Sequence, residues 1–307
     1  MKKFDYYYAR CVGKFLNATE CLMKTIVPTK GKGVVKKLNI SYGSQKGQVM
    51  DIFYTPSTAS KKRPIFFYIH GGGFVSGKIV MRRPYCVQLA KQGFFVVNVD
   101  YRPAPIAHFP TQFNDIFDVI DYIFDRAYEY NLDTSNIVVG GESAGAYFSA
   151  YLSAMACDKS LILKNNIDFR HINQFNVSAT VLINGAYVAE DIIKTKSPFC
   201  KTFIKAFLDL NSADLKDSTK FEQKDFCPFK YMDSNFPPAI VIRGKYDVFD
   251  KGSEKLIQVL ENKKIKHSVF VAKGVAGFHA VTVAPIFRYS KKAFVFTMDK
   301  LKEYLDI

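Results

Sequence analysis

From about residue 50 onwards, short apolar segments rich in β-branched and aromatic residues alternate with segments that carry an apolar stripe at helical spacing. The apolar segments are apolar along their whole length, which is typical of strands covered on both faces. They are RPIFFYIHGG, FFVVNVDY, NIVVGGES, ATVLINGAY, PAIVIRGKYD and HSVFVAKG. KLNISYG and VMDIFYT come earlier without a long helix between them, which predicts an antiparallel edge pair. The alternation predicts an α/β fold with a mostly parallel sheet of about eight strands and helices on both faces.

Two segments depart from this alternation, and we interpret them as parts of one cap over the sheet. Residues 1–32 carry five residues on one helical face: Phe4, Tyr8, Cys11, Phe15 and Leu22. Residues 188–236 form an insert that is too long for a simple crossover. Its apolar side chains include Phe199, Phe203, Phe207 and Leu210. We therefore expect an N-terminal cap helix region over 1–32 and a main domain over 33–307 with a cap insertion at about 188–236. The alternative is a plain surface excursion of the chain.

The chain of 307 residues has a formal net charge of +15, and the location of this charge decides what it implies. Residues 1–40 hold nine basic residues against two acidic ones, and the remaining excess is spread thinly. The basic residues do not belong to an RNP, zinc-finger or P-loop motif. We therefore expect a solvated basic surface and no nucleic-acid partner. Peripheral contact of the basic N-terminus with an anionic membrane is a weaker hypothesis.

The six cysteines show neither CxxC spacing nor a cluster with histidine, so we expect reduced thiols and no metal or organic cofactor. No run approaches eighteen apolar residues, which argues against a membrane span. Polar residues interrupt the stretch after Met1, so no signal peptide is expected. The expected location is therefore the cytoplasm.

The first chemical signal is GGESAG, residues 140–145, at the end of a predicted strand and the start of an apolar helical stretch. A strand-turn-helix junction bends sharply, and Gly141 and Gly145 remove the side chains that would collide there. Ser143 is then held on a strained turn, with its hydroxyl exposed above the strand ends and the helix N-terminus beneath it. The alternative is a glycine-rich turn with an incidental serine.

The second signal is HGGGF, residues 70–74, which also follows an apolar strand. Its three successive glycines present backbone N–H groups with no side chains in the way. Such a loop can hold an anion, and the tetrahedral intermediate of acyl transfer is one. A phosphate loop is the other reading, but no Gly-Lys-Ser/Thr follows.

With DYRPAPIAHFP at 100–110 between them, these motifs resemble the α/β-hydrolase fold, and specifically the hormone-sensitive-lipase-like carboxylesterases. The resemblance covers about residues 49–305 and rests on three motifs in the family's order: His-Gly-Gly-Gly-Phe/Trp, DYR-x-AP-x-x-x-FP and Gly-Asp/Glu-Ser-Ala-Gly. It implies that residues 33–307 are an α/β-hydrolase catalytic domain, and that His70 shapes the glycine loop without being the base. It also implies supporting positions in the two motifs at Gly71, Gly141, Glu142 and Gly145. The oxyanion-hole N–H groups that it implies belong to Gly72, Gly73 and Ala144.

A catalytic triad in this fold runs serine, acid, histidine along the chain. Asp247 and Asp250 both follow the strand PAIVIRG, where sites in open α/β sheets form. The family's pattern Gly-x-x-Asp-x-Leu/Phe-x-Asp places the acid first, so we expect Asp247 to be the acid. Asp250 suits a cap of the following helix better.

His279 is the expected base because it alone follows the last predicted strand. His171 lies in a loop before a strand, His267 precedes its strand at the wrong end of the sheet, and His108 precedes Ser143. Many relatives read His-Gly-Phe, whereas this chain reads Ala-Gly-Phe-His over 276–279. Aligned on Gly-Phe, the base would fall on Ala276. Aligned on the following His-Ala-Val, it falls on His279, which we favour because a loop can shift by a few residues and keep its geometry.

These residues lead us to expect a serine carboxylesterase that hydrolyses short-chain, acetyl-type esters through an acyl-enzyme, with a small-molecule ester as its partner. One alternative is an amidase or arylformamidase that uses the same triad, because a fold does not decide the substrate. Another is a non-catalytic ligand-binding protein on the same scaffold, for which the unusual Ala-Gly-Phe-His loop is the support.

Overall fold

A single mixed sheet runs through the computed structural model, which describes residues 2–23, 31–56, 62–195, 197, 199–217, 219–284 and 286–307. Within these residues the sheet has eight strands in the order β1-β2-β4-β3-β5-β6-β7-β8. β1 pairs antiparallel with β2 and β2 antiparallel with β4, whereas the other neighbours are parallel. The predicted α/β class and the antiparallel edge pair are confirmed. The strands are β1 (Val35–Ser41), β2 (Val49–Tyr54), β3 (Arg63–Ile69), β4 (Phe95–Val99), β5 (Leu132–Glu142), β6 (Ala179–Ile183), β7 (Ala239–Gly244) and β8 (His267–Ala272).

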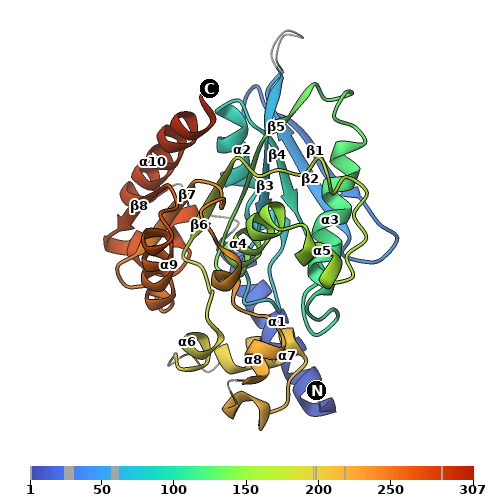
Figure 1. The fold of residues 1–307 in the computed structure, drawn as a ribbon, viewed down its shortest axis with the longest axis vertical. Helices are drawn as coiled ribbons and strands as arrows, with labels where there is room; N and C mark the ends of the chain where they lie inside the picture. Colours follow the sequence, from blue (N-terminus) through green and yellow to red (C-terminus); the bar gives the residue numbers. More distant parts are fainter. Residues whose placement is uncertain are drawn as a thin grey trace.

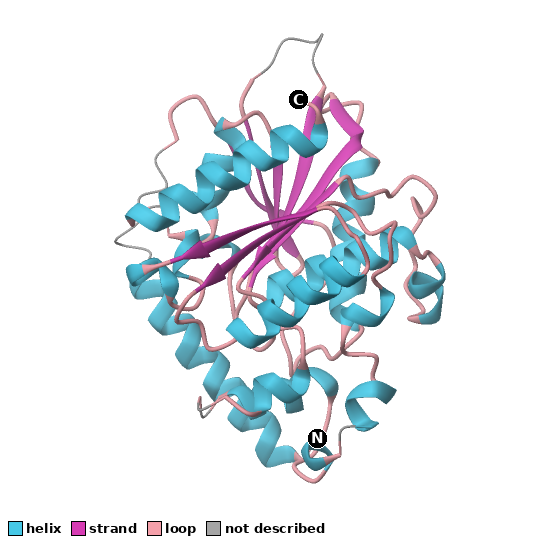
Figure 2. Ribbon diagram, turned by 60° about the vertical axis from the view of Figure 1, so that its left-hand side comes forward, coloured by secondary structure: helices cyan, strands magenta, loops and turns pink. Residues whose placement is uncertain are grey.

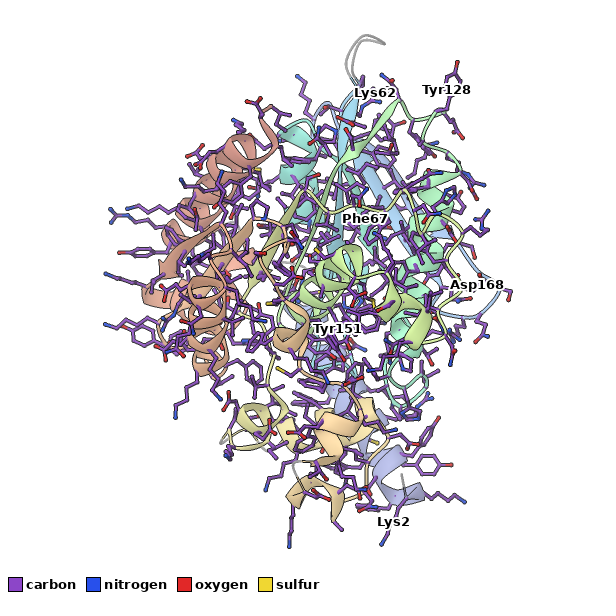
Figure 3. The ribbon with its side chains drawn as sticks, viewed as in Figure 1. Lys2, Lys62, Phe67, Tyr128, Tyr151 and Asp168 are labelled. Carbon is purple, nitrogen blue, oxygen red and sulfur yellow. The ribbon has the colours of Figure 1, made fainter. Side chains whose placement is uncertain are left out.

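Helices cover both faces of this sheet (Figures 1 and 2). Alternate residues of β3 show how the two faces divide, because Phe67 belongs to one buried apolar cluster and Phe66 to the other. Phe67 lies near the middle of the molecule (Figure 3). The first cluster includes residues of α3 (Thr111–Phe124), α4 (Ala144–Cys157), α5 (Ser160–Lys164) and α9 (Asp250–Asn262). The second includes residues of α2 (Arg83–Lys91) and α10 (Arg288–Leu305).

Burial follows the position of each strand in the sheet. β4 and β6 are buried along their whole length, whereas the edge strand β1 is exposed at most positions. A strand covered by helices on both faces must be apolar on both sides, which explains the continuous apolar segments of the sequence. Because the strands from β3 to β8 are parallel, their carboxyl ends and the loops that follow lie at one edge of the sheet.

The N-terminal helix and the insert after β6 lie together at that edge, at the end of the molecule that holds the N-terminus (Figure 1). α1 (Lys3–Met23) contacts α7 (Cys200–Leu208), and Lys205 of α7 forms an ion pair with Asp5 at 2.5 Å. The predicted boundaries at 32 and at 188–236 stay predictions, and residues 24–30 lie outside the described residues. The other elements of the insert are α6 (Ala189–Ile193), η2 (Asp214–Lys216), α8 (Thr219–Gln223) and η3 (Pro228–Tyr231).

The side chains of the helical face expected from residues 1–32 are largely exposed, as far as the structure describes them. Phe4, Tyr8 and Phe15 are 77%, 42% and 57% exposed, whereas Ala9 and Val12 on the opposite face are buried. The reason is steric: the α1 backbone approaches the loop after β3 so closely that a Cβ at position 13, which is glycine, would collide with the carbonyl oxygen of Val75. Small residues therefore face inward and aromatic residues face outward. Cys11 is also exposed, and the side chain of Leu22 lies outside the described residues.

Candidate active site

Ser143 occupies the sharp turn between β5 and α4. Its backbone has φ 56° and ψ −118°, a sparsely populated conformation that costs about 1–3 kcal/mol and needs support from its surroundings. A Cβ at either Gly141 or Gly145 would collide with the carbonyl oxygen of Ile69 at the end of β3, so only glycine fits at both positions. The backbone N–H of Ser143 donates to the carbonyl of Ile183 at 2.8 Å. The turn is thus held by the two strands that flank β5.

His279 brings its ring to this serine. It lies between the short helices η4 (Gly274–Gly277) and η5 (Val281–Val283), which follow β8. The Ser143 hydroxyl and Nε2 of His279 are 2.9 Å apart, within hydrogen-bonding distance. The ring packs edge-on against Phe249, with centroids 4.9 Å apart and an interplanar angle of 90°. This packing limits the rotation of the ring away from Ser143.

Asp247 completes the arrangement from the loop after β7. Both of its carboxylate oxygens lie 3.0 Å from Nδ1 of His279. Its side chain is 1% exposed, and a buried carboxylate needs hydrogen bonds of its own. The backbone N–H of Phe249 donates one at 2.7 Å, and the side-chain amide of Asn184 donates another. With Nδ1–H directed at Asp247, the lone pair of Nε2 faces the serine hydroxyl.

Asn184 is a residue that the sequence analysis did not identify. It follows β6 at the carboxyl edge of the sheet, is 1% exposed, and has φ 49°. Its amide nitrogen donates to Asp247, and its carbonyl oxygen accepts a hydrogen bond from the Thr282 hydroxyl at 3.2 Å. The amide therefore links the loop of Asp247 to the loop of His279. The sequence signal that could have identified Asn184 is an Asn-Gly pair directly after β6, the strand that pairs with β5.

Asp250 lies outside this network. Its carboxylate forms two hydrogen bonds with Arg243, at 2.7 and 2.6 Å. The expectation that Asp250 caps the following helix is wrong: α9 begins at Asp250 itself, the preceding residue is Phe249, and no side chain caps the helix. The guanidinium of Arg243 competes for the carboxylate and draws it away from the helix N–H groups.

The other histidines are held elsewhere. His108 is 2.7 Å from the carbonyl of Ala206 and thereby joins the DYRPAPIAHFP loop to α7. His171 lies 3.0 Å from Asp125, near the end of α3. His267 is the first residue of β8 and therefore lies at the edge of the sheet opposite to Ser143. The structure brings only His279, of the four histidines considered for the base, to Ser143.

The glycine loop follows β3 and curls beside Ser143. Gly72 and Gly73 have φ +127° and +59°, conformations that favour glycine. Within the described residues their backbone N–H groups donate to no protein acceptor. Ala144 is the first residue of α4, so its N–H has no acceptor within the helix. These three groups are the implied oxyanion-hole donors, and N–H groups of this kind can stabilise negative charge on a substrate oxygen.

Glu142 ties the glycine loop to the serine turn. It is fully buried, and its carboxylate accepts hydrogen bonds from the backbone N–H of Gly71 at 2.7 Å and from the hydroxyl of Tyr68 at 2.5 Å. Nε of Arg82 donates to the same carboxylate at 2.5 Å. A buried carboxylate with three donors is satisfied and rigid, so Glu142 fixes the distance between the two motifs.

His70 supports the loop from below. Its Nδ1 lies 2.7 Å from the carbonyl oxygen of Gly71 and its Nε2 lies 3.0 Å from the carboxylate of Asp100. Both partners are acceptors, so both ring nitrogens can donate hydrogen bonds when the ring is protonated. Burial lowers the pKa of His70, but the hydrogen bonds to Asp100 and Gly71 outweigh it and the pKa is raised. The ring also stacks on Tyr101, with centroids 4.5 Å apart.

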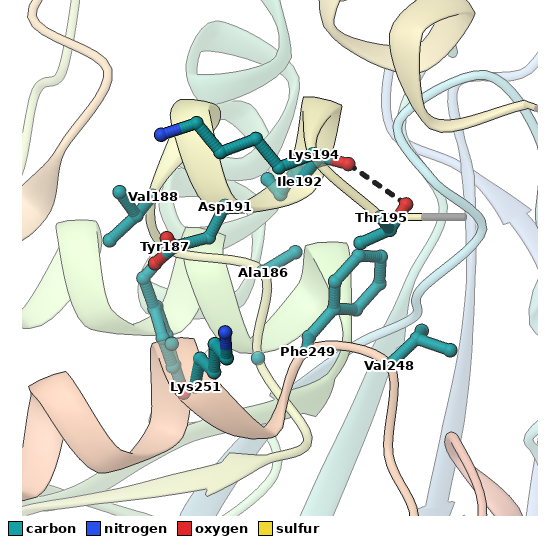
Figure 4. Close-up of a pocket in the computed structure, with 12 residues that line it drawn as sticks. Ala186, Tyr187, Val188, Asp191, Ile192, Lys194, Thr195, Val248, Phe249 and Lys251 are labelled. Carbon is teal, nitrogen blue, oxygen red and sulfur yellow. Dashed lines mark hydrogen bonds between the residues drawn. The ribbon is translucent and has the colours of Figure 1, made fainter. Parts of the chain in front are cut away.

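A cavity of about 280 Å³ opens above these groups. The glycine loop, Ser143 and His279 form its floor, and the cap provides Leu16 of α1 and Phe203 of α7. A second cavity of about 360 Å³ adjoins it behind Phe249 (Figure 4). The two share four lining residues: Ala186, Ile192, Val248 and Phe249. The second cavity therefore borders the one that Ser143 and His279 line.

The described residues offer no cluster of three or more His, Cys, Asp or Glu side chains that could hold a metal ion. Within the same residues, no helix is long and apolar enough to cross a membrane. A serine hydroxyl beside an imidazole that is oriented by a carboxylate can act as a nucleophile.

Comparisons with known proteins show the family and the fold of this chain. Residues 50–260, more than half of the chain, match the family model described as BD-FAE. The acetyl esterase of Salmonella schwarzengrund (strain CVM19633) is 27% identical over 220 residues, which cover 70% of this chain and 64% of that protein. Esterase LipC of Mycobacterium tuberculosis is 26% identical over 215 residues, which cover 69% of this chain and 51% of that protein. The chain thus spans less than two thirds of the length of either relative.

Among solved structures, esterase B from Lactobacillus rhamnosis (HN001) is similar over 97% of both chains, with a TM-score of 0.79 and 18% sequence identity. This likeness shows that the two proteins share a fold.

Proposed function

The chain belongs to the BD-FAE family and has the α/β-hydrolase fold, and we propose that it is a serine carboxylesterase that hydrolyses short-chain acyl esters through an acyl-enzyme intermediate. The observation that carries the proposal is the continuous hydrogen-bonded series from the Ser143 hydroxyl through His279 to Asp247, with separations of 2.9 and 3.0 Å. The relatives named acetyl esterase and esterase LipC support an ester as the substrate.

In the first half of the reaction, Oγ of Ser143 attacks the ester carbonyl carbon while Nε2 of His279 accepts the hydroxyl proton. The carbonyl oxygen becomes an anion, which accepts hydrogen bonds from the N–H groups of Gly72, Gly73 and Ala144. Asp247 stabilises the imidazolium that forms and keeps its ring in place. His279 then returns the proton to the alkoxide leaving group, and the acyl group remains on Ser143.

In the second half, a water molecule takes the position that the alcohol has left. His279 removes its proton, the hydroxide adds to the acyl carbon, and the same three N–H groups hold the second oxyanion. Collapse of this intermediate breaks the bond to Oγ, and His279 returns the proton to Ser143. The products are a carboxylic acid and the regenerated enzyme.

The shape of the cavity supports a short acyl group. The ring of Phe203 lies directly on the glycine loop, because a Cβ built on Gly73 would come within 2.7 Å of it. An acyl chain that extends from Ser143 toward the cap therefore meets this ring. The alcohol part must lie on the side of His279, since that ring protonates the leaving oxygen, and the second cavity behind Phe249 gives it room.

The test is the hydrolysis of p-nitrophenyl acetate and butyrate, with the corresponding anilides as the amide comparison. We expect turnover of the esters, much slower turnover of the anilides, and covalent labelling of Ser143 by an organophosphate. Ser143→Ala and His279→Ala should each lower kcat by several orders of magnitude without unfolding the chain. His171→Ala, a surface histidine paired with Asp125, is the matched control and should keep full activity.

Two results would contradict the proposal. If the folded protein hydrolysed neither ester and Ser143 did not react with the organophosphate, the scaffold would be a ligand-binding protein. If the anilide were the faster substrate of the same acyl group, the amidase alternative would replace the esterase.

A further inference from the structure

The outward face of α1 carries four large aromatic side chains, which we call the aromatic stripe: Phe4, Tyr7, Tyr8 and Phe15. They are 77%, 58%, 42% and 57% exposed. Residues at these positions share one side of a helix. Single exposed apolar residues are ordinary on protein surfaces, but four aromatics on one helical face form a patch of the kind that marks a binding surface.

Lysines border the aromatic stripe on both sides, and we call them the basic rim: Lys3, Lys14, Lys194, Lys201 and Lys216. All five are exposed. Lys3 and Lys14 lie on α1 itself, beside Tyr7. The other three line a surface hollow of about 700 Å³ together with Phe4 and Tyr8. The hollow also holds Asp5 and Lys205, which neutralise each other in an ion pair. The surface around the stripe is therefore cationic.

We propose that α1 docks on an anionic phospholipid surface through the aromatic stripe and the basic rim. Aromatic rings settle at the level of the lipid headgroups, with their apolar parts in the acyl boundary, and lysines beside them pair with lipid phosphates. The charge of the rim argues for this partner over a second copy of the chain. Two copies that met through this face would bring two basic rims together, and like-charge repulsion would oppose their association.

The position of α1 connects this surface to the catalytic cavity. Leu16, one residue after the end of the stripe, lines the cavity. Phe15 contacts Phe199, another lining residue, with centroids 6.2 Å apart. A docked α1 therefore holds the cavity next to the lipid surface, where it can take esters that are dissolved in the bilayer. This last step rests on the proposed function, whereas the docking itself does not.

The test is the flotation of the full chain with phosphatidylcholine vesicles, with and without phosphatidylserine. We expect the protein to float with the phosphatidylserine vesicles and the binding to weaken as salt is raised. The triple variant Phe4→Ser/Tyr7→Ser/Tyr8→Ser should bind about tenfold more weakly or worse, because it removes the buried rings. Lys201→Gln/Lys216→Gln should weaken binding to phosphatidylserine by roughly fivefold per lysine.

Tyr128→Ser is the matched control, because Tyr128 is 99% exposed and lies at the end of the molecule opposite to Lys2 (Figure 3). It should bind vesicles as the unchanged chain does. All variants should hydrolyse soluble p-nitrophenyl acetate at the same rate, because none of the substituted residues touches the site. Loss of that activity in the triple variant alone would show that its cap had unfolded. Vesicle binding of the lysine double variant would then be compared with that of the unchanged chain.

Three results would overturn the proposal: no flotation of the unchanged chain, equal flotation of the variants, or a stable dimer in ultracentrifugation that the triple variant converts to a monomer. The last would assign the face to a second copy. A chain that floats but hydrolyses no ester would leave the docking intact and refute only the proposed function.

Discussion

Phe203 offers the sharpest test of where the acyl group lies. Its ring belongs to α7 of the cap, rests on Gly73 of the glycine loop and lines the cavity that holds Ser143. Phe203→Ala would remove the ring and leave the glycine loop, Ser143 and His279 unchanged. The acyl chain could then extend into the vacated space.

The size of the effect follows from the burial of methylene groups. Each methylene moved from water to an apolar wall contributes about 0.8 kcal/mol, which is roughly a fourfold change in kcat/KM. Two further methylenes, from butyrate to hexanoate, should therefore raise the hexanoate-to-butyrate ratio of kcat/KM by roughly 16-fold in Phe203→Ala. The variant should stay folded, because a half-buried Phe costs less than the ~3–5 kcal/mol of a fully buried one.

The assay is kcat/KM for p-nitrophenyl acetate, butyrate, hexanoate and octanoate, with circular dichroism to check the fold. Phe221→Ala on α8 is the control, because Phe221 is buried in the same cap but does not line the cavity. It should destabilise the cap without moving the chain-length optimum. An unchanged optimum in a folded Phe203→Ala variant would refute the reasoning, because the acyl chain would then run away from the cap.

Further predictions concern the residues around the imidazole and the glycine loop. Asp247→Asn should lower kcat by about 10³–10⁴-fold, whereas Asp250→Asn, which weakens a partly buried ion pair with Arg243 outside the site, should change kcat by about twofold or less. Asn184→Ala should lower kcat/KM by about tenfold to hundredfold, since it removes a hydrogen bond to a buried charge worth ~1.5–3 kcal/mol; unchanged kinetics would contradict its positioning role. The raised pKa of His70 contributes stability that is fully present below the unfolded value of about 6.5 and is lost as pH rises through the folded pKa. Urea unfolding at a series of pH values measures the free energy of unfolding. The difference in this free energy between the unchanged chain and Asp100→Asn should therefore shrink as the pH rises.

The sheet was predictable from the sequence because its signal is local. A strand between two helical layers must be apolar on both sides, and β4 and β6 are buried at every position. The antiparallel edge was predictable because no helix separates β1 from β2. A helix after Asp250 was predictable, but its start was not, since the carboxylate of Asp250 is hydrogen-bonded to Arg243 across the turn. Such a contact depends on the fold and not on the local pattern.

The same distinction applies to the site. Ser143 and the glycine loop belong to motifs whose residues are adjacent in the chain, so the sequence identifies them directly. Asn184 belongs to no motif, and its partners Asp247 and Thr282 lie 63 and 98 positions away. Its importance appears only when the loops after β6, β7 and β8 meet at one edge of the sheet. The outward direction of the aromatic stripe was hidden for a related reason, because periodicity shows that residues share a face but not which face packs.

The loop Ala276-Gly277-Phe278-His279 shows how the histidine can sit three residues later than in many relatives and still reach Ser143. Gly277 anchors the loop: its carbonyl accepts a hydrogen bond from the backbone N–H of Tyr246 at 2.9 Å, one residue before Asp247. Ala276, where alignment on Gly-Phe would put the base, is 1% exposed. Phe278 points outward and is 54% exposed, so the next residue turns inward. The backbone that fixes Asp247 therefore also sets the position of His279, and the two side chains meet because their loops are bonded to each other.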